Sequence, residues 1–255
     1  MEMSNSEKAT AIQNSLETNT GETLGLINPK HYKQHNPNIA DGFDAIIKFH
    51  HQLPMDKVYS NVIRAFQDGD FGFVHVDYFL FEPVVVFDVH RFDKGQSVEH
   101  WDNLQTNTKK ANKSGRTMTD GKTKAIDHHL TEANKRIATD FVTNVLINKN
   151  VDQLDRFFQG DVLIQHNPQM GDGVSEFLNV LKQLKDEGIE QNYVRIHKAL
   201  GEGNFVLIMS EGFVGSKPYA FYDLYRIEKS KILEHWDVIE EIPPLENQKN
   251  TNGKF

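Results

Sequence analysis

Two four-residue phrases each occur twice in this 255-residue chain, in the same order and at nearly the same spacing. Gln-His-Asn-Pro occupies residues 34–37 and 165–168, and Glu-His-Trp-Asp occupies residues 99–102 and 234–237. The copies are 131 and 135 positions apart, so they differ only by a few loop residues. A period of this length indicates a duplicated domain and not a solenoid repeat.

Weaker echoes between these anchors support the duplication. Asp41-Gly42 recurs as Asp172-Gly173, residues 65–71 resemble residues 199–205, and residues 87–91 resemble residues 222–226. Two halves of this size can each bury a hydrophobic core. The sequence therefore predicts a first domain over residues 1–105, a polar and basic linker over 106–125, a second domain over 126–245, and a disordered tail over 246–255.

Composition narrows the class of partner. The formal net charge of -8 and the pI near 5.8 disfavour binding to nucleic acid or to an anionic membrane surface. The absence of cysteine excludes disulfides, a thiolate nucleophile and cysteine-based metal sites. No apolar run approaches the length of a membrane span or a signal peptide. We expect a cytoplasmic protein that binds a small molecule.

Hydrophobic periodicity changes along each copy from helical to strand-like. In the second copy the spacing predicts a helix capped by Thr131, a short helix near residues 154–158, and a helix capped by Asp172 that ends near Gly188. Strands are predicted over residues 193–200, 205–213, 217–227 and 232–241. In the first copy a short helix, interrupted at 19–21, precedes strands over 58–66, 71–79, 83–92 and 98–104. Helices followed by an antiparallel meander indicate an α+β fold with helices on one face of the sheet.

Alternation on the last strand of each copy places an imidazole and a carboxylate on the same face. His100 and Asp102 share one face in the first copy, as His235 and Asp237 do in the second, and aliphatic residues flank both pairs. Burial raises the pKa of a carboxylate unless a neighbouring imidazolium lowers it again. Such a competition can place a general acid or base near neutrality.

The preceding strands add further polar side chains. Asp88 alternates with apolar residues and His90, and Asp223 alternates with apolar residues and Tyr225. His75 and Glu211 are predicted on the strands before these. Aromatic walls with a few convergent polar groups are typical of a small-molecule pocket.

These segments resemble the SnoaL-like polyketide cyclase family of the nuclear transport factor-like, or cystatin-like, superfamily. The resemblance rests on the Gln-His-Asn-Pro loop followed by Asp-Gly, on residues 203–206, 210–212 and 221–226, and on both Glu-His-Trp-Asp strands. It covers nearly the whole chain as two tandem domains. It implies cone-shaped domains, each with N-terminal helices packed on a curved antiparallel sheet. It further implies an intramolecular version of the dimer that single-domain relatives form, and a further homo-oligomer is compatible with it.

The resemblance also implies roles for individual residues. Asp102 and Asp237 would abstract a proton, with His100 and His235 as partners and with no metal and no cofactor. Asp88 and Asp223 match the acid that, in ketosteroid isomerases, donates a hydrogen bond to the enolate oxygen. The expected substrate-binding residues are His35, Asn36, His166, Asn167, His75, His90, Tyr225 and Glu211.

The expected function is cofactor-independent acid/base catalysis on a small, mostly apolar carbonyl compound through an enolate, of the aldol cyclase or isomerase type. A non-catalytic small-molecule binding protein with the same pockets is the alternative, and a protein-interaction platform is a third reading. The His/Asp pairs could also be structural, and Asp41 and Asp172 are better explained as helix caps. Trp101 and Trp236 are expected to face away from the pocket.

Overall fold

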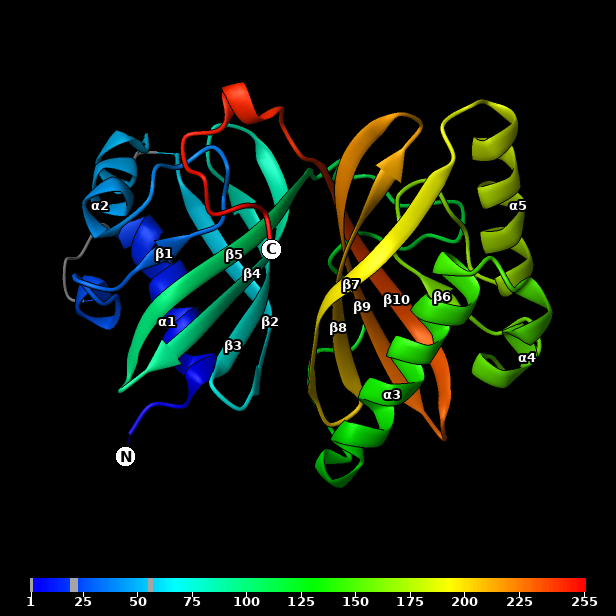
Figure 1. Cartoon of the computed structure of the whole chain (residues 1–255). Coiled ribbons are helices and arrows are strands. Elements are labelled where there is room, and N and C mark those ends of the chain that lie inside the picture. Colours follow the sequence, from blue (N-terminus) through cyan, green and yellow to red (C-terminus); the bar gives the residue numbers. More distant parts are fainter. Residues whose placement is uncertain (1, 19–22, 55–56) are drawn as a thin grey trace. The chain divides into compact units, whose positions relative to one another are not determined.

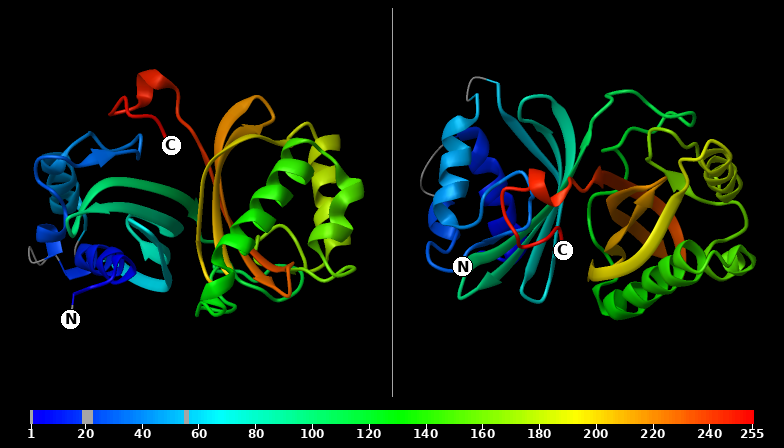
Figure 2. Two further views of the ribbon diagram at one scale, coloured as in Figure 1. Left: turned by 60° about the horizontal axis from the view of Figure 1, so that its bottom comes forward. Right: turned by 45° about the horizontal axis from the view of Figure 1, so that its top comes forward.

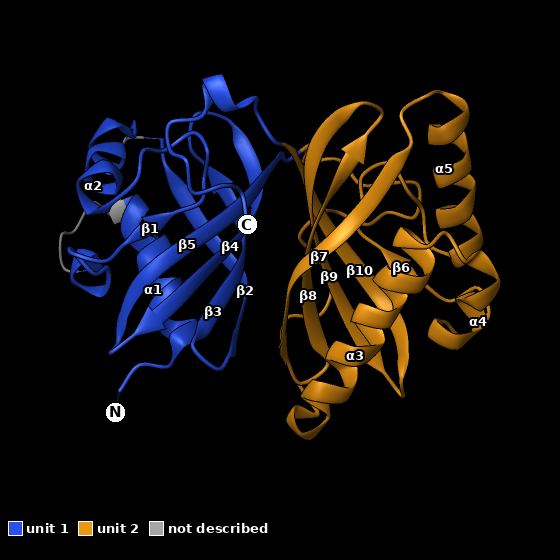
Figure 3. Ribbon diagram, in the orientation of Figure 1, with its two compact units in different colours: residues 1–107, 242–255 blue, residues 108–241 orange. Residues whose placement is uncertain are grey.

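The computed structural model describes residues 2–18, 23–54 and 57–255. The chain forms two compact units, which Figure 3 distinguishes by colour. Unit 1 contains residues 1–107 and 242–255, and unit 2 contains residues 108–241. The predicted interruption of the first helix at 19–21 lies outside the described residues. No helix in the described ranges is long and apolar enough to span a bilayer.

Unit 1 combines two α-helices with a five-stranded sheet, as Figure 1 shows. In chain order its elements are α1 (Asn5–Thr18), the 3-10 helix η1 (Thr23–Leu26), β1 (Lys33–Gln34), α2 (Phe43–Gln52), β2 (Tyr59–Asp68), β3 (Phe71–Phe79), β4 (Pro83–Asp93), β5 (Gln96–Thr106) and the 3-10 helix η5 (Leu245–Asn247). The strand order is β1-β5-β4-β3-β2, and only the β1–β5 pair is parallel.

Unit 2 repeats this topology with sheet order β6-β10-β9-β8-β7, and again only its short first strand is parallel to its neighbour. Its elements are η2 (His128–Leu130), α3 (Thr131–Phe141), the π-helix η3 (Val142–Ile147), η4 (Val151–Gln153), α4 (Leu154–Phe157), β6 (Ile164–Gln165), α5 (Val174–Asp186), β7 (Gln191–Glu202), β8 (Phe205–Val214), β9 (Lys217–Glu228) and β10 (Lys231–Glu241). The equal strand orders confirm the α+β fold and the duplication.

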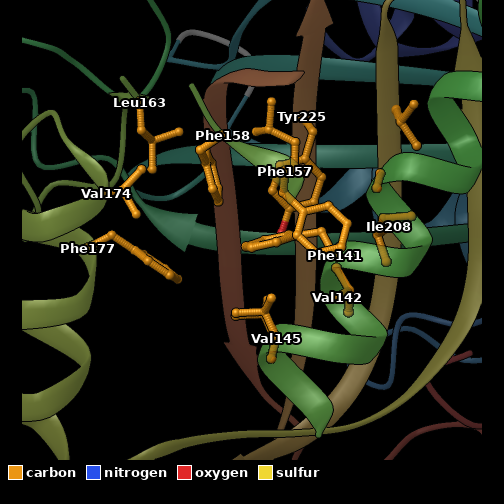
Figure 4. Packing of buried hydrophobic residues seen from close by; sticks show 14 of the residues in the cluster. Phe141, Val142, Val145, Phe157, Phe158, Leu163, Val174, Phe177, Ile208 and Tyr225 are labelled. Carbon is orange, nitrogen blue, oxygen red and sulfur yellow. The ribbon is translucent and has the colours of Figure 1, made fainter. Parts of the chain in front are cut away.

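Helices cover one face of the sheet in each unit, as the views in Figure 2 show. Alternate strand residues such as Val74 and Val76 on β3 are fully buried and pack with Ala9 and Ile12 of α1 in the core of unit 1. In unit 2 the ring of Phe141 lies edge-on to Phe157, Phe158 and Tyr225 (Figure 4). Burial of these apolar side chains is the main force that holds the helices on the sheets.

Predicted and observed strands agree to within a few residues, but the predicted helix cap is wrong. The carboxylate of Asp172 accepts the backbone N–H of Gln165 at 3.0 Å, as that of Asp41 accepts the N–H of Gln34 at 2.9 Å. Each aspartate therefore closes the loop that contains Gln-His-Asn-Pro. The start of α5 is instead capped by Asp161, which accepts the backbone N–H of Ser175 at 2.6 Å.

The predicted linker is an ordered part of unit 2. The side-chain amide of Asn112 donates to the backbone carbonyls of Gln165 at 2.7 Å and Asn167 at 3.3 Å. The backbone carbonyl of Thr117 accepts a hydrogen bond from His166 Nδ1 at 2.8 Å. We call residues 108–121 the strap of unit 2, because they hold down its Gln-His-Asn-Pro loop.

The predicted disordered tail makes equivalent contacts in unit 1. The amide of Asn250 donates to the carbonyls of Asn36 at 2.7 Å and Ile39 at 2.8 Å, and His35 Nδ1 donates to the carbonyl of Gly253 at 2.8 Å. Residues 249–254 are therefore the strap of unit 1. Each strap has glycine three positions after its asparagine, Gly115 in one and Gly253 in the other, with φ of 78° and 79°. Glycine adopts this left-handed conformation without steric strain.

Candidate functional site

The two repeated phrases interlock through the parallel pairing at the sheet edge. Gln34 is in register with His100, and Gln165 is in register with His235. The side-chain oxygen of Gln34 accepts the backbone N–H of Asn36 at 2.8 Å and lies 2.9 Å from His100 Nδ1. An amide oxygen only accepts, so Nδ1 of His100 carries the proton.

The second nitrogen of each imidazole faces a carboxylate on the neighbouring strand. His100 Nε2 lies 2.6 Å from Asp88 Oδ1, and His235 Nε2 lies 2.9 Å from Asp223 Oδ1. Burial lowers the pKa of His100 and His235, but the hydrogen bond and the charge of these aspartates outweigh it and leave each pKa above its usual value. In both pairs the protonated form of the histidine is therefore favoured.

The aspartate two positions after each histidine is held by an asparagine instead. Asn36 Nδ2 donates to Asp102 Oδ2 at 2.6 Å, and Asn167 Nδ2 donates to Asp237 Oδ2 at 2.7 Å. In the described part of the chain, Oδ1 of each aspartate accepts no hydrogen bond. The predicted partnership of His100 with Asp102, and of His235 with Asp237, is therefore corrected to a partnership across strands.

Asp102 and Asp237 differ in the charged groups that lie near them. Burial raises the pKa of Asp237, with the charge of Asp223 adding to the effect and the charge of His235 and the Asn167 hydrogen bond opposing it. In unit 1 the ammonium of Lys254, from the strap, lies 3.7 Å from Asp102 Oδ1. Asp102 thus has a buried cation beside its free oxygen.

Each group of polar side chains borders a small cavity on the helix-covered face. The cavity of unit 1 has a volume of about 60 Å³, and its polar lining includes Asp88, His90, His100, Asp102 and Asn36. The cavity of unit 2 has a volume of about 20 Å³ and is lined by the residues Phe141, Leu146, Phe158, Leu163, Met170, Phe177, Leu181, Gln191, Tyr193, Asp223, Tyr225, Ile232, His235 and Asp237. One water needs a cavity volume of roughly 10–15 Å³, so the two cavities accept one to a few waters without rearrangement.

A surface groove adjoins the cavity of unit 2. Leu146, Leu181, Gln191 and Tyr193 line both the cavity and this groove, whose volume is about 220 Å³. These side chains form the wall between the two spaces. Their rotation would join the groove to the cavity that Asp237 lines.

His35 and His166 do not line the cavities, so their predicted placement is wrong. His35 stacks on Trp101 at 4.7 Å between ring centroids and bonds Glu99 at 2.9 Å. His166 stacks on Trp236 at 4.6 Å and bonds Glu234 at 2.8 Å. The reason is alternation, because each follows a glutamine that faces inward. The tryptophans face away from the cavities, as expected.

His75 and Glu211 are also on the opposite face of their sheets, contrary to the prediction. His75 Nδ1 accepts a hydrogen bond from Arg64 at 2.9 Å, and Glu211 forms ion pairs with Arg195 and His197, each at 3.0 Å. Neighbouring residues on a strand point to opposite faces, and the core-facing residues of β3 are Val74 and Val76.

The structure brings the remaining predicted residues together. His90 and Asn36 line the cavity of unit 1, Tyr225 lines that of unit 2, and Asn167 reaches it through Asp237. The sequence did not reveal Tyr193, whose hydroxyl donates to Asp223 Oδ1 at 3.2 Å. Also missed were Tyr32, His50 and Tyr78 in unit 1. Only the strand register and the helix packing could have identified them.

Three ionisable groups converge in each unit. In unit 1 the nearest ligand atoms of Asp88, His90 and His100 all lie within 4.8 Å of one another. In unit 2 the groups within the same distance are Asp223, His235 and Asp237, so only one of them is an imidazole. The fold and these sites define a duplicated α+β protein with a buried carboxylate-imidazole cluster in each unit.

No protein-family model and no curated protein matches this chain. Solved structures do: an NTF2-like protein of unknown function from Cytophaga hutchinsonii is 11% identical, with a TM-score of 0.37, over 41% of this chain and 93% of its own. A proposed polyketide cyclase from Acidithiobacillus ferrooxidans is 16% identical, with a TM-score of 0.34, over 42% of this chain and 87% of its own. A proposed ketosteroid isomerase from Kribbella flavida is 12% identical, with a TM-score of 0.37, over 45% of this chain and 84% of its own.

Proposed function

We propose that unit 2 is an acid/base catalytic site that acts on a small, mostly apolar carbonyl compound through an enolate, without a cofactor, in an aldol cyclase or isomerase type of reaction. One observation carries this proposal. Asp237 is buried and fixed by Asn167 through one oxygen, while its other oxygen is free beside an apolar cavity and an imidazole-carboxylate pair.

Asp237 is the proposed base. Its free Oδ1 would take a proton from the carbon next to the substrate carbonyl, and the electron pair of the broken C–H bond would pass into the enolate. Burial raises the pKa of Asp237, so its carboxylate is a stronger base than an exposed one. The protonated carboxyl can then return the proton to another carbon, or the enolate can attack a second carbonyl.

The enolate oxygen needs hydrogen-bond donors. The hydroxyl of Tyr193 and the imidazolium of His235 are the donors at this end of the cavity, and both now donate to Asp223. The raised pKa of His235 favours its imidazolium, which donates to Asp223. We therefore assign the donor role to Tyr193 and His235, and Asp223 is the acceptor that positions them.

Unit 1 contains the same types of group in Asp102, His100 and Asp88. Its candidate base differs, because Lys254 neutralises the surroundings of the free oxygen of Asp102. The free oxygen of Asp102 already faces an ammonium group, which an incoming substrate would have to displace. We therefore propose that unit 2 carries the larger share of the proton transfer.

Exchange of carbon-bound hydrogen tests the proposal directly. The intact protein is incubated in D2O with a panel of small β-dicarbonyl compounds, and deuterium incorporation is followed by NMR. Exchange should be catalysed by the wild type and lost in Asp237→Asn, which keeps the hydrogen bond to Asn167. Asp102→Asn is the matched control and should keep most of the activity. Full activity in Asp237→Asn would refute the assignment.

A non-catalytic binding protein is the second candidate. The largely apolar lining of both cavities favours it, although a ligand larger than a few waters would enter only after the lining side chains move. A binder should retain its affinity for a ligand when Asp237 is replaced by asparagine, and it should show no exchange above the buffer rate. The same two variants therefore separate the two functions.

A further inference from the structure

Two imidazoles and one carboxylate lie side by side on the inner face of unit 1. His90 on β4 and His100 on β5 are directly paired across the strands, and their ring centroids are 4.6 Å apart. Asp88 is two residues from His90, so its side chain emerges on the same face. All three side chains are buried, with exposed fractions of 2% to 6%.

The outer nitrogen of each imidazole is already occupied. Nδ1 of His100 is bonded to the oxygen of Gln34, and Nδ1 of His90 lies 2.9 Å from the hydroxyl oxygen of Ser97. A hydrogen bond at one ring nitrogen that fixes the orientation of the other is typical of metal-binding histidines. Both Nε2 atoms are thereby presented to the space beside Asp88.

The inner nitrogen of His90 has no hydrogen bond. In the described part of the chain, Nε2 of His90 is buried without a donor or acceptor. A buried polar atom without a hydrogen-bond partner destabilises the folded state. A ligand that binds Nε2 of His90 would remove that cost. His90 and His100 both line the cavity of about 60 Å³, which has room for an ion and a bound water.

We propose that Asp88, His90 and His100 bind one divalent transition-metal ion, with Zn²⁺ as the expected occupant. Two imidazole nitrogens and one carboxylate oxygen are a common set of protein ligands for such ions. Metal–ligand distances of roughly 2.0–2.2 Å require the Asp88 and His100 atoms, now 2.6 Å apart, to separate to about 3.3 Å. Nε2 of His100 must also release to solvent the proton that it now shares with Asp88, so binding would weaken as the pH falls. The fourth position would face the cavity and Asp102. An ion there would polarise a bound carbonyl or water.

Unit 2 does not have this ligand set. Tyr225 stands at the position of His90, directly opposite His235, and its ring stacks on that imidazole at 4.9 Å. The duplicated chain thus supplies a natural matched control, because the two units share the fold, the glutamine contact and the first His/Asp pair.

Metal binding to the intact, chelator-stripped protein tests this inference. Titration calorimetry with ZnCl2 should show one tight equivalent, and Co²⁺ should give the visible absorption of a four-coordinate site. His90→Tyr, which copies the residue of unit 2, should weaken this binding by at least about 100-fold while the metal-free melting temperature shows whether the fold persists. Asp88→Asn is a second variant for the case that His90→Tyr does not fold. The double variant His128→Ala with His129→Ala, at an exposed pair, should bind as the wild type does.

Two results would overturn the inference: a wild type that binds no stoichiometric Zn²⁺, or folded His90→Tyr and Asp88→Asn variants that bind it as tightly as the wild type. Tyr225→His gives unit 2 the histidine that it lacks and should raise the number of Zn²⁺ ions bound per chain from one to two. Misfolding would not produce such a gain. Because these measurements read binding in unit 1, their failure leaves the proposed catalysis in unit 2 standing.

Discussion

Unit 1 and unit 2 have the same contacts around the sheet edge and different groups at the cavity. In both, a glutamine holds the inner histidine, an asparagine holds the inner aspartate, and an outer histidine stacks on tryptophan. These contacts account for nearly every letter of the two repeated phrases. The repetition that is most visible in the sequence therefore reflects how the loop is fixed to the last strand.

The differences lie where a ligand would bind. His90 of unit 1 corresponds to Tyr225 of unit 2, and His50, which lines the first cavity, corresponds to Leu181, which lines the second. Lys254 adds a cation only to the first. Two copies with a common framework thus have different side chains at their cavities, and we expect their functions to differ as well.

Replacement of the two free aspartates should give the largest difference between the units. Asp237→Asn should lower catalysed hydrogen exchange by roughly 10²- to 10⁴-fold, the usual contribution of a general base. Asp102→Asn should change it by only a few fold, because the free oxygen of Asp102 already faces the ammonium of Lys254. Initial exchange rates at saturating substrate measure both effects. Equal losses in the two variants would show that the units share the reaction.

Removal of the outer tryptophans should destabilise the two units alike. Trp101 and Trp236 are 3% and 0% exposed, so Trp101→Ala and Trp236→Ala should each lower the free energy of unfolding by about 3–5 kcal/mol. Hydrogen exchange followed by mass spectrometry should place the loss in the loop and last strand of the altered unit. Substitution by phenylalanine keeps an aromatic ring against the histidine and should be milder. A loss below about 1 kcal/mol would contradict the structural role of the stack.

Acid should destabilise unit 1 through His50. Burial, helped by the charge of His51, lowers the pKa of His50 to about 4. Its contribution to stability is therefore complete above pH 6.5 and is lost as the pH falls towards 4, because the unfolded chain takes up the proton first. The loss amounts to about 3 kcal/mol at its limit.

His50→Leu, which copies Leu181, should remove this acid sensitivity. The measurement is denaturant unfolding between pH 4 and pH 7. His51→Leu removes only the smaller of the two causes, so it should reduce the acid sensitivity much less than His50→Leu does. An unaltered profile in His50→Leu would mean that other groups cause the acid loss.

Removal of the strap asparagines should have the smallest effect. Asn112→Ala and Asn250→Ala each delete two hydrogen bonds to buried carbonyls, at a cost of about 1–3 kcal/mol. They also delete the bonds that the side-chain oxygen accepts from backbone N–H groups, two at Asn112 and one at Asn250. The exposed neighbours Lys113 and Thr251 provide controls that should change the free energy of unfolding by less than the asparagines do. Thermal melting of the four alanine variants makes the comparison. Unequal losses at the two asparagines would show that the straps are not equivalent.

Periodicity was sufficient to predict the strands, the α+β class and the duplication, but not the partners of the site residues. Residues two apart on a strand are separated by roughly 6.5 Å, so side chains as short as those of His100 and Asp102 do not reach each other unless they lean together. The partner comes from the next strand, where diagonal neighbours approach, and that requires the register between β4 and β5.

Short segments limited the prediction in a second way. A strand of two residues has no measurable alternation, so β1 and β6 were missed and His35 and His166 were assigned to the wrong face. The straps have no regular structure and are polar, and they therefore looked like a linker and a tail. The recurrence of asparagine and, three residues later, glycine was the signal that could have identified them.

The straps also determine whether the two units can be produced as separate fragments. Each unit is completed by residues that follow the last strand of the other in the chain, so a cut between residues 107 and 108 would leave the first fragment without its own closing segment and the second with one it does not use. A fragment of residues 1–107 would lose Asn250 and Lys254 together. Because unit 1 is built from two separate stretches of the chain, we do not expect it to be transferred as one continuous segment to another protein.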